Sequence, residues 1–532
     1  MKSSRIQNGR RHLQASVTAS AWQTKWLLFD RFANCSASNT TSTDALSLNH
    51  ALWCRNFDCF EVGAESTTCL AGDFCTDATQ VLGFAARFDL IADSGVFSAN
   101  VADSSHDNNI LLTSSNFVEF LEPHSIPTPI NLTMPDPNKP PQLKLRKGYD
   151  RRLICGHEWV FSNEISASES PLTSIQPGDL VHVLDHKGKF LASAYYNPRT
   201  LIAARVVSRK PMAALDIDWL RPRLRQALDM RESVFKQPFY RWVHGEADGL
   251  PGLVIDRFGQ HLTIQISTAG MQRLETQIVG AVSEMIDVQG IVLRADDHFR
   301  ELEGLTVGAP QIIGDVPDQV EVCEGSLRFE TRLVSGQKTG WYFDQRDNRA
   351  RLARYIKDRE VLDVFSYAGA WGITAAAAGA RSVTCIDSSA QAIELAQRNA
   401  ILNSCEINPI CDDAFDALRK LGEANRRFQV IVLNPPALIK RKKDYDAGRQ
   451  AYYQLNRLAA KLLADDGLLI SCSCSHHLPH SELVEIVHHA ARTHDRRSSI
   501  LEIGQQSADH PIHPAIPETA YLKAIFVRMV KQ

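Results

Sequence analysis

The sequence of 532 residues lacks any long apolar run. Even the alanines at 375–378 are flanked by polar and glycine positions, and no stretch approaches the roughly 18 consecutive apolar residues that indicate a membrane span. The hydrophobic fraction of 44% and the charged fraction of 22% are ordinary for a globular protein. We therefore expect a protein with buried cores and no membrane partner, and the length favours three or four domains.

An excess of positive charge is also missing. The formal net charge is −3, so no global basic field indicates a nucleic-acid binder, and contacts with a nucleic acid must come from local patches. Through Pro140 the chain has nine Lys and Arg against fourteen Asp and Glu, which leaves 49 against 47 for the remainder. The part after Pro140 is therefore slightly basic.

The twelve cysteines are irregularly spaced and contain no CxxC pair. This pattern gives no indication of a zinc ribbon or a dithiol redox motif, and we expect no metal. Reduced thiols of this kind are typical of a cytoplasmic protein.

Residues 1–133 lack a sustained hydrophobic period and are rich in Ser, Thr and Asn in places, so we expect little stable structure there. The first 29 residues contain no Asp or Glu, which resembles an organelle transit peptide. An alternative, which we favour, is that translation begins at Met134, just before a stiff proline-rich entry. In both cases this segment is expected to be dispensable for activity.

Three further domains are expected. Short β-like runs separated by Gly and Asn-Pro turns predict a small β-barrel over residues 141–212. A helix at 219–235 and a second at 271–286, mixed with strands at 252–255, 262–266 and 290–293, predict an α+β middle domain over 213–333. Regular alternation of strands and helices over 334–532 predicts a parallel, doubly wound sheet.

The strand at 360–364 leads through Phe365, Ser366 and Gly369 into a helix. Such a turn lets a ligand approach the backbone and the free N–H groups of the helix. Asp387 ends the next strand, where a carboxylate can accept hydrogen bonds from ribose hydroxyls. A nicotinamide-binding domain would show similar spacing, but Gly-x-Gly-x-x-Gly is absent here. Asp413 is expected either to receive an adenine amino group or to cap the helix at 414–418.

Two later strands end in polar loops that we expect at the same edge of the sheet. Asn434 is followed by Pro435 and Pro436, whose rigid rings offer a flat face to a base; the alternative is an ordinary strand-ending turn. Cys472 and Cys474 end the next strand, before His476 and His477. Each thiol is either a nucleophile assisted by a histidine or a small buried hydrophobe.

Several blocks in order carry a family resemblance that spans about Leu143 to the C-terminus. The sequence resembles the bacterial 23S large-subunit ribosomal RNA cytosine-C5 methyltransferases that carry an N-terminal PUA domain. The matching blocks lie at 156–164, 245–253, 336–346, 365–369, 473–475 and 508–511.

The resemblance implies a Rossmann-like, seven-stranded class I methyltransferase domain preceded by a PUA-like RNA-binding β-barrel and a small α+β domain. It implies S-adenosyl-L-methionine as the cofactor and large-subunit ribosomal RNA as the partner; a homodimer is compatible with it. The resemblance places the cofactor against Gln337, Phe365, Ser366, Gly369, Asp387 and Asp413, and the target base against Cys474, Asn434, Pro435 and Pro436.

The implied reaction needs a nucleophile, because C5 of cytosine becomes reactive enough only when a thiolate adds to C6. Cys474 is the implied nucleophile, and Cys472 has no required role. His510 and a water are both candidates for removing the C5 proton.

One departure matters, since the family commonly has Asp-Pro-Pro where this chain has Asn434-Pro435-Pro436. The Asn form also occurs in enzymes that methylate exocyclic amines, so N-methylation of RNA stays an alternative, as does a non-catalytic RNA-binding assembly factor.

Overall fold

The computed structural model describes residues 86–90, 97–101, 110–112, 139–296, 298–336 and 339–532. The chain divides into two compact units, residues 1–131 and 132–532. In the first unit, three short strands form an antiparallel sheet that the sequence analysis did not predict: β1 (Ala86–Leu90), β2 (Phe97–Val101) and β3 (Ile110–Leu112). The proposed transit peptide and Met134 lie outside the described residues.

The second unit begins with a five-stranded sheet in the order β4-β6-β7-β8-β5. Left-handed glycines at 178 and 188 make the tight turns before β6 and β7. Alternate strand residues such as Val181 and Val183 are buried in one small core. The strands are β4 (Gln142–Lys144), β5 (Trp159–Phe161), β6 (Asp179–Leu184), β7 (Phe190–Tyr196) and β8 (Ile202–Ser208), with the short helix α4 (Arg151–Ile154).

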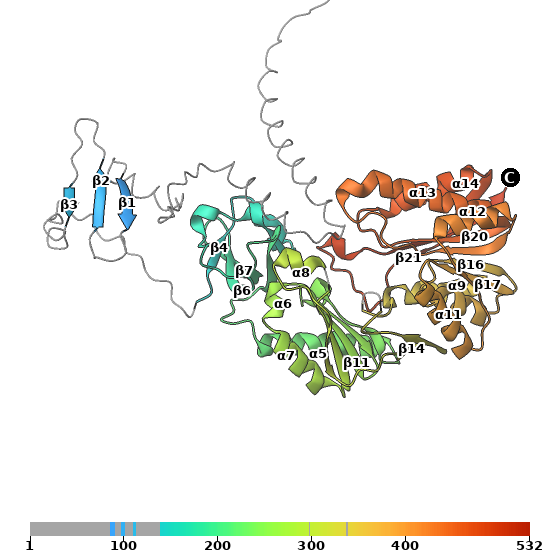
Figure 1. Ribbon diagram of the computed structural model, residues 1–532, viewed down its shortest axis with the longest axis horizontal. Helices are drawn as coiled ribbons and strands as arrows, with labels where there is room; N and C mark the ends of the chain where they lie inside the picture. Colours follow the sequence, from blue (N-terminus) through green and yellow to red (C-terminus); the bar gives the residue numbers. More distant parts are fainter. Residues whose placement is uncertain (1–85, 91–96, 102–109, 113–138, 297, 337–338) are drawn as a thin grey trace, which may run out of the picture. The chain divides into compact units, whose positions relative to one another are not determined.

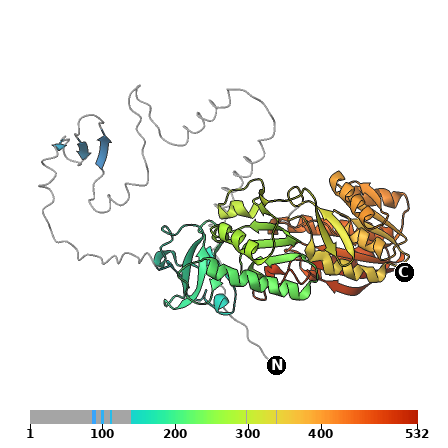
Figure 2. The same ribbon diagram turned by 90° about the horizontal axis from the view of Figure 1, so that it is seen from below.

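The middle part is a second five-stranded sheet, ordered β13-β12-β11-β10-β9, in which β11 and β12 are parallel. The long helix α5, the long green helix of Figure 2, packs beside β9 and α7. The predicted helices and strands of this region are confirmed, with the helix at 271–286 split into α6 and α7. The elements are α5 (Ile217–Val234), β9 (Phe239–His244), β10 (Leu253–Phe258), β11 (His261–Ile266), α6 (Ala269–Gln272), α7 (Glu275–Met285), β12 (Gly290–Arg294), α8 (His298–Glu303) and β13 (Gln311–Gly314).

A hairpin of β14 (Val320–Glu324) and β15 (Leu327–Thr331) leads to the C-terminal part. Its seven-stranded sheet has the order β18-β17-β16-β19-β20-β22-β21. The strands are β16 (Glu360–Val364), β17 (Ser382–Asp387), β18 (Asn408–Cys411), β19 (Phe428–Leu433), β20 (Leu463–Ser473), β21 (Arg496–Gly504) and β22 (Lys523–Lys531). The helices are α9 (Arg346–Leu352), α10 (Ala370–Ala377), α11 (Ala390–Leu402), α12 (Ala414–Glu423), α13 (Tyr445–Leu462) and α14 (His480–Arg492).

Helices cover both faces of this sheet (Figure 1). Because side chains alternate along a strand, Leu362 and Ile431 pack with α12, α13 and α14, whereas Val361 and Val430 pack with α9 and α10. The five strands β16 to β20 run parallel, so their carboxyl ends share one edge.

The alternation of elements predicted a fully parallel sheet, and this prediction is wrong for its last strand. β22 lies between β20 and β21 and is antiparallel to both. It follows β21 without a crossover helix, and a parallel neighbour would need one. Among the helices of the described residues, none has the length and apolar character needed to cross a membrane.

Candidate active site

The turn after β16 contains residues with positive φ angles. Phe365 and Tyr367 have φ of 65° and 47°, and Gly369, at the N-terminus of α10, has φ of 78°. A positive φ is costly for a residue with a Cβ and persists only where the surroundings impose it, which is common at binding sites. The Ser366 N–H donates to the Ile386 carbonyl at 3.0 Å, so β17 holds this turn against the sheet edge.

Asp387, the last residue of β17, braces the same turn. Its Oδ2 accepts from the Tyr367 N–H at 2.9 Å and its Oδ1 accepts from the Ser389 N–H at 3.0 Å. A carboxylate has about four acceptor sites, so Asp387 retains capacity for hydroxyl donors.

The Asn434 amide is oriented by a chain of hydrogen bonds. Asn348 Nδ2 donates to the Gln505 carbonyl at 3.1 Å, and its Oδ1 accepts from Arg351 at 2.8 Å. A carbonyl only accepts and a guanidinium only donates, so the orientation of Asn348 is fixed. Asn348 Nδ2 then donates to Gln345 Oε1, and Gln345 Nε2 donates to Asn434 Oδ1, both at 2.8 Å. Asn434 therefore presents its oxygen to Gln345 and keeps its NH₂ group for another acceptor.

The two cysteines differ in their surroundings. Cys472 lies inside β20, is fully buried with α9 and α10 side chains, and burial raises the pKa of its thiol. Cys474 follows the strand, is half-buried, and its Sγ lies 4.0 Å from the Pro435 carbonyl oxygen.

Polar contacts fix the backbone on both sides of Cys474. Ser473 Oγ donates to the Tyr452 hydroxyl at 2.9 Å, and the same hydroxyl lies 3.0 Å from Ser475 Oγ. Ser475 Oγ also accepts from the Ile439 N–H at 3.1 Å, and the Lys523 ammonium donates to the Ser475 carbonyl at 2.7 Å. Residues from β22, α13 and the loop after β19 thus hold this segment.

One cavity of about 460 Å³ brings most of the predicted residues together. It is lined by Phe365, Ser366, Asp387, Asn434, Pro435, Pro436 and Cys474, and also by Asp344, Gln345 and Trp371. Gly369 shapes the turn but is not in the lining. Asp413 is exposed and caps α12, accepting from the N–H groups of Phe415 and Asp416, and it is also outside the lining. Gln337 lies outside the described residues.

The cavity wall contains buried polar atoms that call for a polar ligand. Ser366 Oγ and Trp371 Nε1 are buried and have no hydrogen-bond partner among the described residues. Such groups cost free energy unless a ligand or water satisfies them. The first residues of α10 and Asp387 belong to the same wall, so this wall combines residues that carry donors with one that carries an acceptor.

The histidines considered from the sequence lie elsewhere. His476 is exposed, and neither it nor His477 lines the cavity. His510 lines a neighbouring cavity of about 520 Å³. Burial lowers the pKa of His510 to about 3, so its ring is neutral and Nδ1 donates to Asp509 Oδ1 at 2.9 Å.

Sequence reasoning missed Asp344, Gln345, Tyr452 and Lys523. The first two lie in the stretch at 336–346 that resembles the family, but within this stretch only Gln337 was predicted to contact the cofactor. Tyr452 and Lys523 have no local signal, because a helix and a late strand bring them to the loop.

Two stretches of the chain match known families. Residues 143–209 match the PUA-like domain family, and residues 348–498 match the family described as conserved hypothetical protein 95. The ribosomal RNA large subunit methyltransferase I of Cronobacter sakazakii is 34% identical over 389 residues, covering 72% of this chain and 98% of the relative. The protein of the same name from Klebsiella pneumoniae is 33% identical over 397 residues, with 73% and 98% covered.

Two solved structures share the fold. A Streptococcus mutans protein classed as a SAM-dependent methyltransferase superposes with a TM-score of 0.63 at 19% identity, covering 73% of this chain and 99% of its own. A methyltransferase complexed with SAH gives the same TM-score at 18% identity and the same coverage.

Proposed function

Because the chain belongs to the ribosomal RNA large subunit methyltransferase I family, we propose that it methylates C5 of a cytosine in large-subunit ribosomal RNA. The cofactor is S-adenosylmethionine, which supplies the methyl group when bound. Ser366, Trp371 and the N-terminus of α10 offer donors for the polar groups of this cofactor, and Asp387 offers an acceptor for its ribose hydroxyls. The predicted contacts of Gln337, Gly369 and Asp413 stay part of the proposal.

Cys474 is the proposed nucleophile. Its thiolate sulfur forms a bond to C6 of the cytosine, and the ring electrons that move to C5 make that carbon able to accept the methyl group. A base such as water then takes the C5 proton, the electron pair of the C5–H bond re-forms the C5–C6 double bond, and the C6–S bond breaks to release the thiolate. The fixed backbone around Cys474 supports this role, because an oriented nucleophile requires little reorganisation.

The observation that carries the proposal is the shared cavity of Cys474, Asn434 and the turn after β16. The orientation of Asn434 favours C5 over an exocyclic amine. Its oxygen accepts from Gln345, so the NH₂ group is the part of the amide left to donate to the cytosine N3, and the oxygen keeps only one lone pair for an amino donor. Pro435 and Pro436 form the adjacent wall against which the base would lie.

A covalent trap tests the proposal. In RNA substituted with 5-fluorocytosine, C5 carries no proton after methylation, so the sulfur cannot leave and the adduct persists. We expect a protein–RNA adduct that survives denaturing electrophoresis with the unchanged chain and with Cys472→Ala, and no adduct with Cys474→Ala. Cys472→Ala is the matched control because it removes a thiol two residues away.

The alternatives give different results in the same preparation. Methylation at full rate by Cys474→Ala, with an N-methylated nucleoside in the mass spectrum, would establish the exocyclic-amine activity. Absence of S-adenosylmethionine binding in calorimetry would instead indicate a non-catalytic RNA-binding factor.

A further inference from the structure

Asp344 is a buried carboxylate on the wall between two cavities. It lies in η4 (Phe343–Gln345), is 6% exposed, and lines both the cavity that contains Cys474 and the neighbouring one of about 520 Å³. Its Oδ1 has no hydrogen-bond partner in the described part of the chain. A buried acceptor without a partner costs free energy unless a ligand or water supplies a donor.

The Asp344 carboxylate is held in place by its surroundings. The hydroxyl of the half-buried Tyr521 donates to its Oδ2 at 2.7 Å, and the Ser507 N–H donates to its backbone carbonyl at 3.0 Å. Burial raises the pKa of Tyr521, so the phenol keeps its proton and acts as the donor. With Oδ2 fixed, Oδ1 has a defined position.

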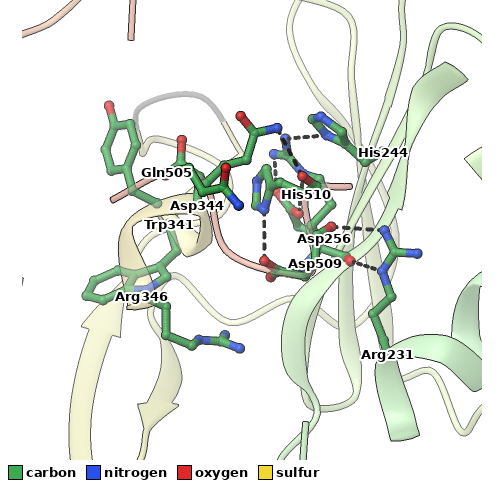
Figure 3. A network of polar contacts seen from close by, with 12 residues as sticks. Arg231, His244, Asp256, Trp341, Asp344, Arg346, Gln505, Asp509 and His510 are labelled. Atoms are coloured by element: carbon green, nitrogen blue, oxygen red, sulfur yellow. Dashed lines mark hydrogen bonds and ion pairs between the residues drawn. The ribbon is translucent and has the colours of Figure 1, made fainter. Parts of the chain in front are cut away.

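The other charged groups around the neighbouring cavity are already paired, and Figure 3 shows one such contact, between His510 and Asp509. Arg241 makes two hydrogen bonds of 2.9 Å to Asp256, and Arg294 is paired with Asp296. His510 donates to Asp509, as described above. Among these side chains, Asp344 is thus the carboxylate that keeps an acceptor atom without a described partner.

Cytosine and uracil share the C5–C6 bond that a thiolate attacks, so the cysteine chemistry alone does not separate them. They differ in their hydrogen-bonding edges: cytosine has an acceptor at N3 and an amino donor at N4, whereas uracil has a donor at N3 and an acceptor at O4. Asn434 and Asp344 line one cavity with Cys474. Their side chains offer an NH₂ donor and a carboxylate acceptor, a pair that matches cytosine and mismatches uracil at both atoms.

We propose that Asp344 is the residue that selects cytosine, by accepting a hydrogen bond from its exocyclic amino group. This inference rests on the proposed function. A site built to accept such a bond rejects a ligand that lacks the donor by about 10⁴-fold or more, because the buried carboxylate oxygen would then face a carbonyl oxygen.

The test compares ribosomal RNA transcripts that carry 5-fluorocytosine or 5-fluorouracil at the target position. The unchanged protein should form an adduct with the first and not with the second. Asp344→Asn should lower the rate of adduct formation with the first at least a hundredfold. It should also reduce the preference for the first over the second, because its NH₂ group can donate to O4 while the Asn434 NH₂ group still opposes the uracil N3–H. Tyr521→Phe keeps the carboxylate but frees Oδ2, and it should lower the discrimination by about tenfold.

Other results would overturn the proposal. One is an unaltered preference for 5-fluorocytosine over 5-fluorouracil in both variants. Another is a tenfold weaker calorimetric binding of S-adenosylmethionine by Asp344→Asn without a change in base preference, because the carboxylate would then contact the methyl donor. If the unchanged protein forms no adduct with 5-fluorocytosine RNA, the proposed function has failed rather than the role of Asp344.

Discussion

Residues that are close in sequence can have opposite chemical surroundings. Cys472 points into the core between the sheet and α10, whereas Cys474 follows the end of the strand and reaches the cavity. Burial without a charged partner favours the neutral thiol of Cys472. Cys474 is half-buried, and a nearby cation favours the thiolate form of a cysteine, which is the form that reacts.

Lys523 supplies that cation, and its ionisation predicts a pH dependence of stability. The side chain is 8% exposed, and burial lowers its pKa from 10.5 to about 8. The folded protein therefore binds this proton less tightly than the unfolded chain, so the contribution of Lys523 to the free energy of unfolding rises from pH 8 to pH 10.5. We expect Lys523→Met to lack this rise and to be more stable at pH 7 by about 1 kcal/mol, after the lost hydrogen bond to Ser475 is subtracted.

Urea denaturation at pH 7, 8.5 and 10 measures the effect. The difference in the free energy of unfolding between the unchanged protein and Lys523→Met should vary with pH. The same difference for Lys531→Met, on the exposed end of the same strand, should stay constant. A constant difference for both variants would contradict the prediction. The rate of the covalent trap should fall in Lys523→Met, because the thiolate loses its neighbouring ammonium.

At the scale of elements, the position of α10 depends on close packing against β17. A Cβ at Gly372 would lie 2.5 Å from Cys385 Sγ and 3.1 Å from Val383 Cγ1. Gly372→Ala should push the helix away from the sheet, lower the free energy of unfolding by about 1–3 kcal/mol, and weaken S-adenosylmethionine binding. Thermal unfolding and calorimetry measure the two effects.

Gly280→Ala is the control for this prediction. Gly280 lies inside α7 with no atom within 4 Å of the added Cβ, so alanine should stabilise the protein by about 0.5–1 kcal/mol. Equal effects of the two substitutions would show that α10 tolerates a shift.

At the scale of the whole molecule, a buried ionic network joins the middle and C-terminal parts (Figure 3). Arg231, which is fully buried, makes hydrogen bonds of 2.5 and 2.7 Å to Asp248 and a third of 2.9 Å to the Asp509 carbonyl. The Asp509 carboxylate in turn accepts from the Arg241 N–H at 3.0 Å.

Removing Arg231 should therefore destabilise the junction. Arg231→Met leaves Asp248 buried without its partner, and we expect a loss of about 3–5 kcal/mol in thermal or urea unfolding. Arg225→Met is the control on the same helix, since its exposed contact with Asp229 at 3.9 Å should contribute less than about 0.5 kcal/mol. A similar small loss for both would mean that the network does not join the two parts.

The N-terminal segment offers a second prediction at this scale. Residues 132–532 form a compact unit of their own, and the residues that line the cavity all belong to it. A chain that begins at Met134 should retain the unfolding temperature within about 2 °C and the full rate of adduct formation. A large loss of either would assign a role to residues 1–133.

The sequence by itself determined the strand–turn–helix around Gly369, the polar loops after β19 and β20, and the alternation of elements in the C-terminal part, because local periodicity and turn residues specify them. It could not decide which polar groups meet. Three hydrogen bonds show this: those of Gln345 with Asn434, of Lys523 with Ser475 and of Tyr521 with Asp344 join residues that are 48 to 177 positions apart. Such contacts, like the antiparallel return of β22, follow from how the chain closes on itself, and no local pattern encodes them.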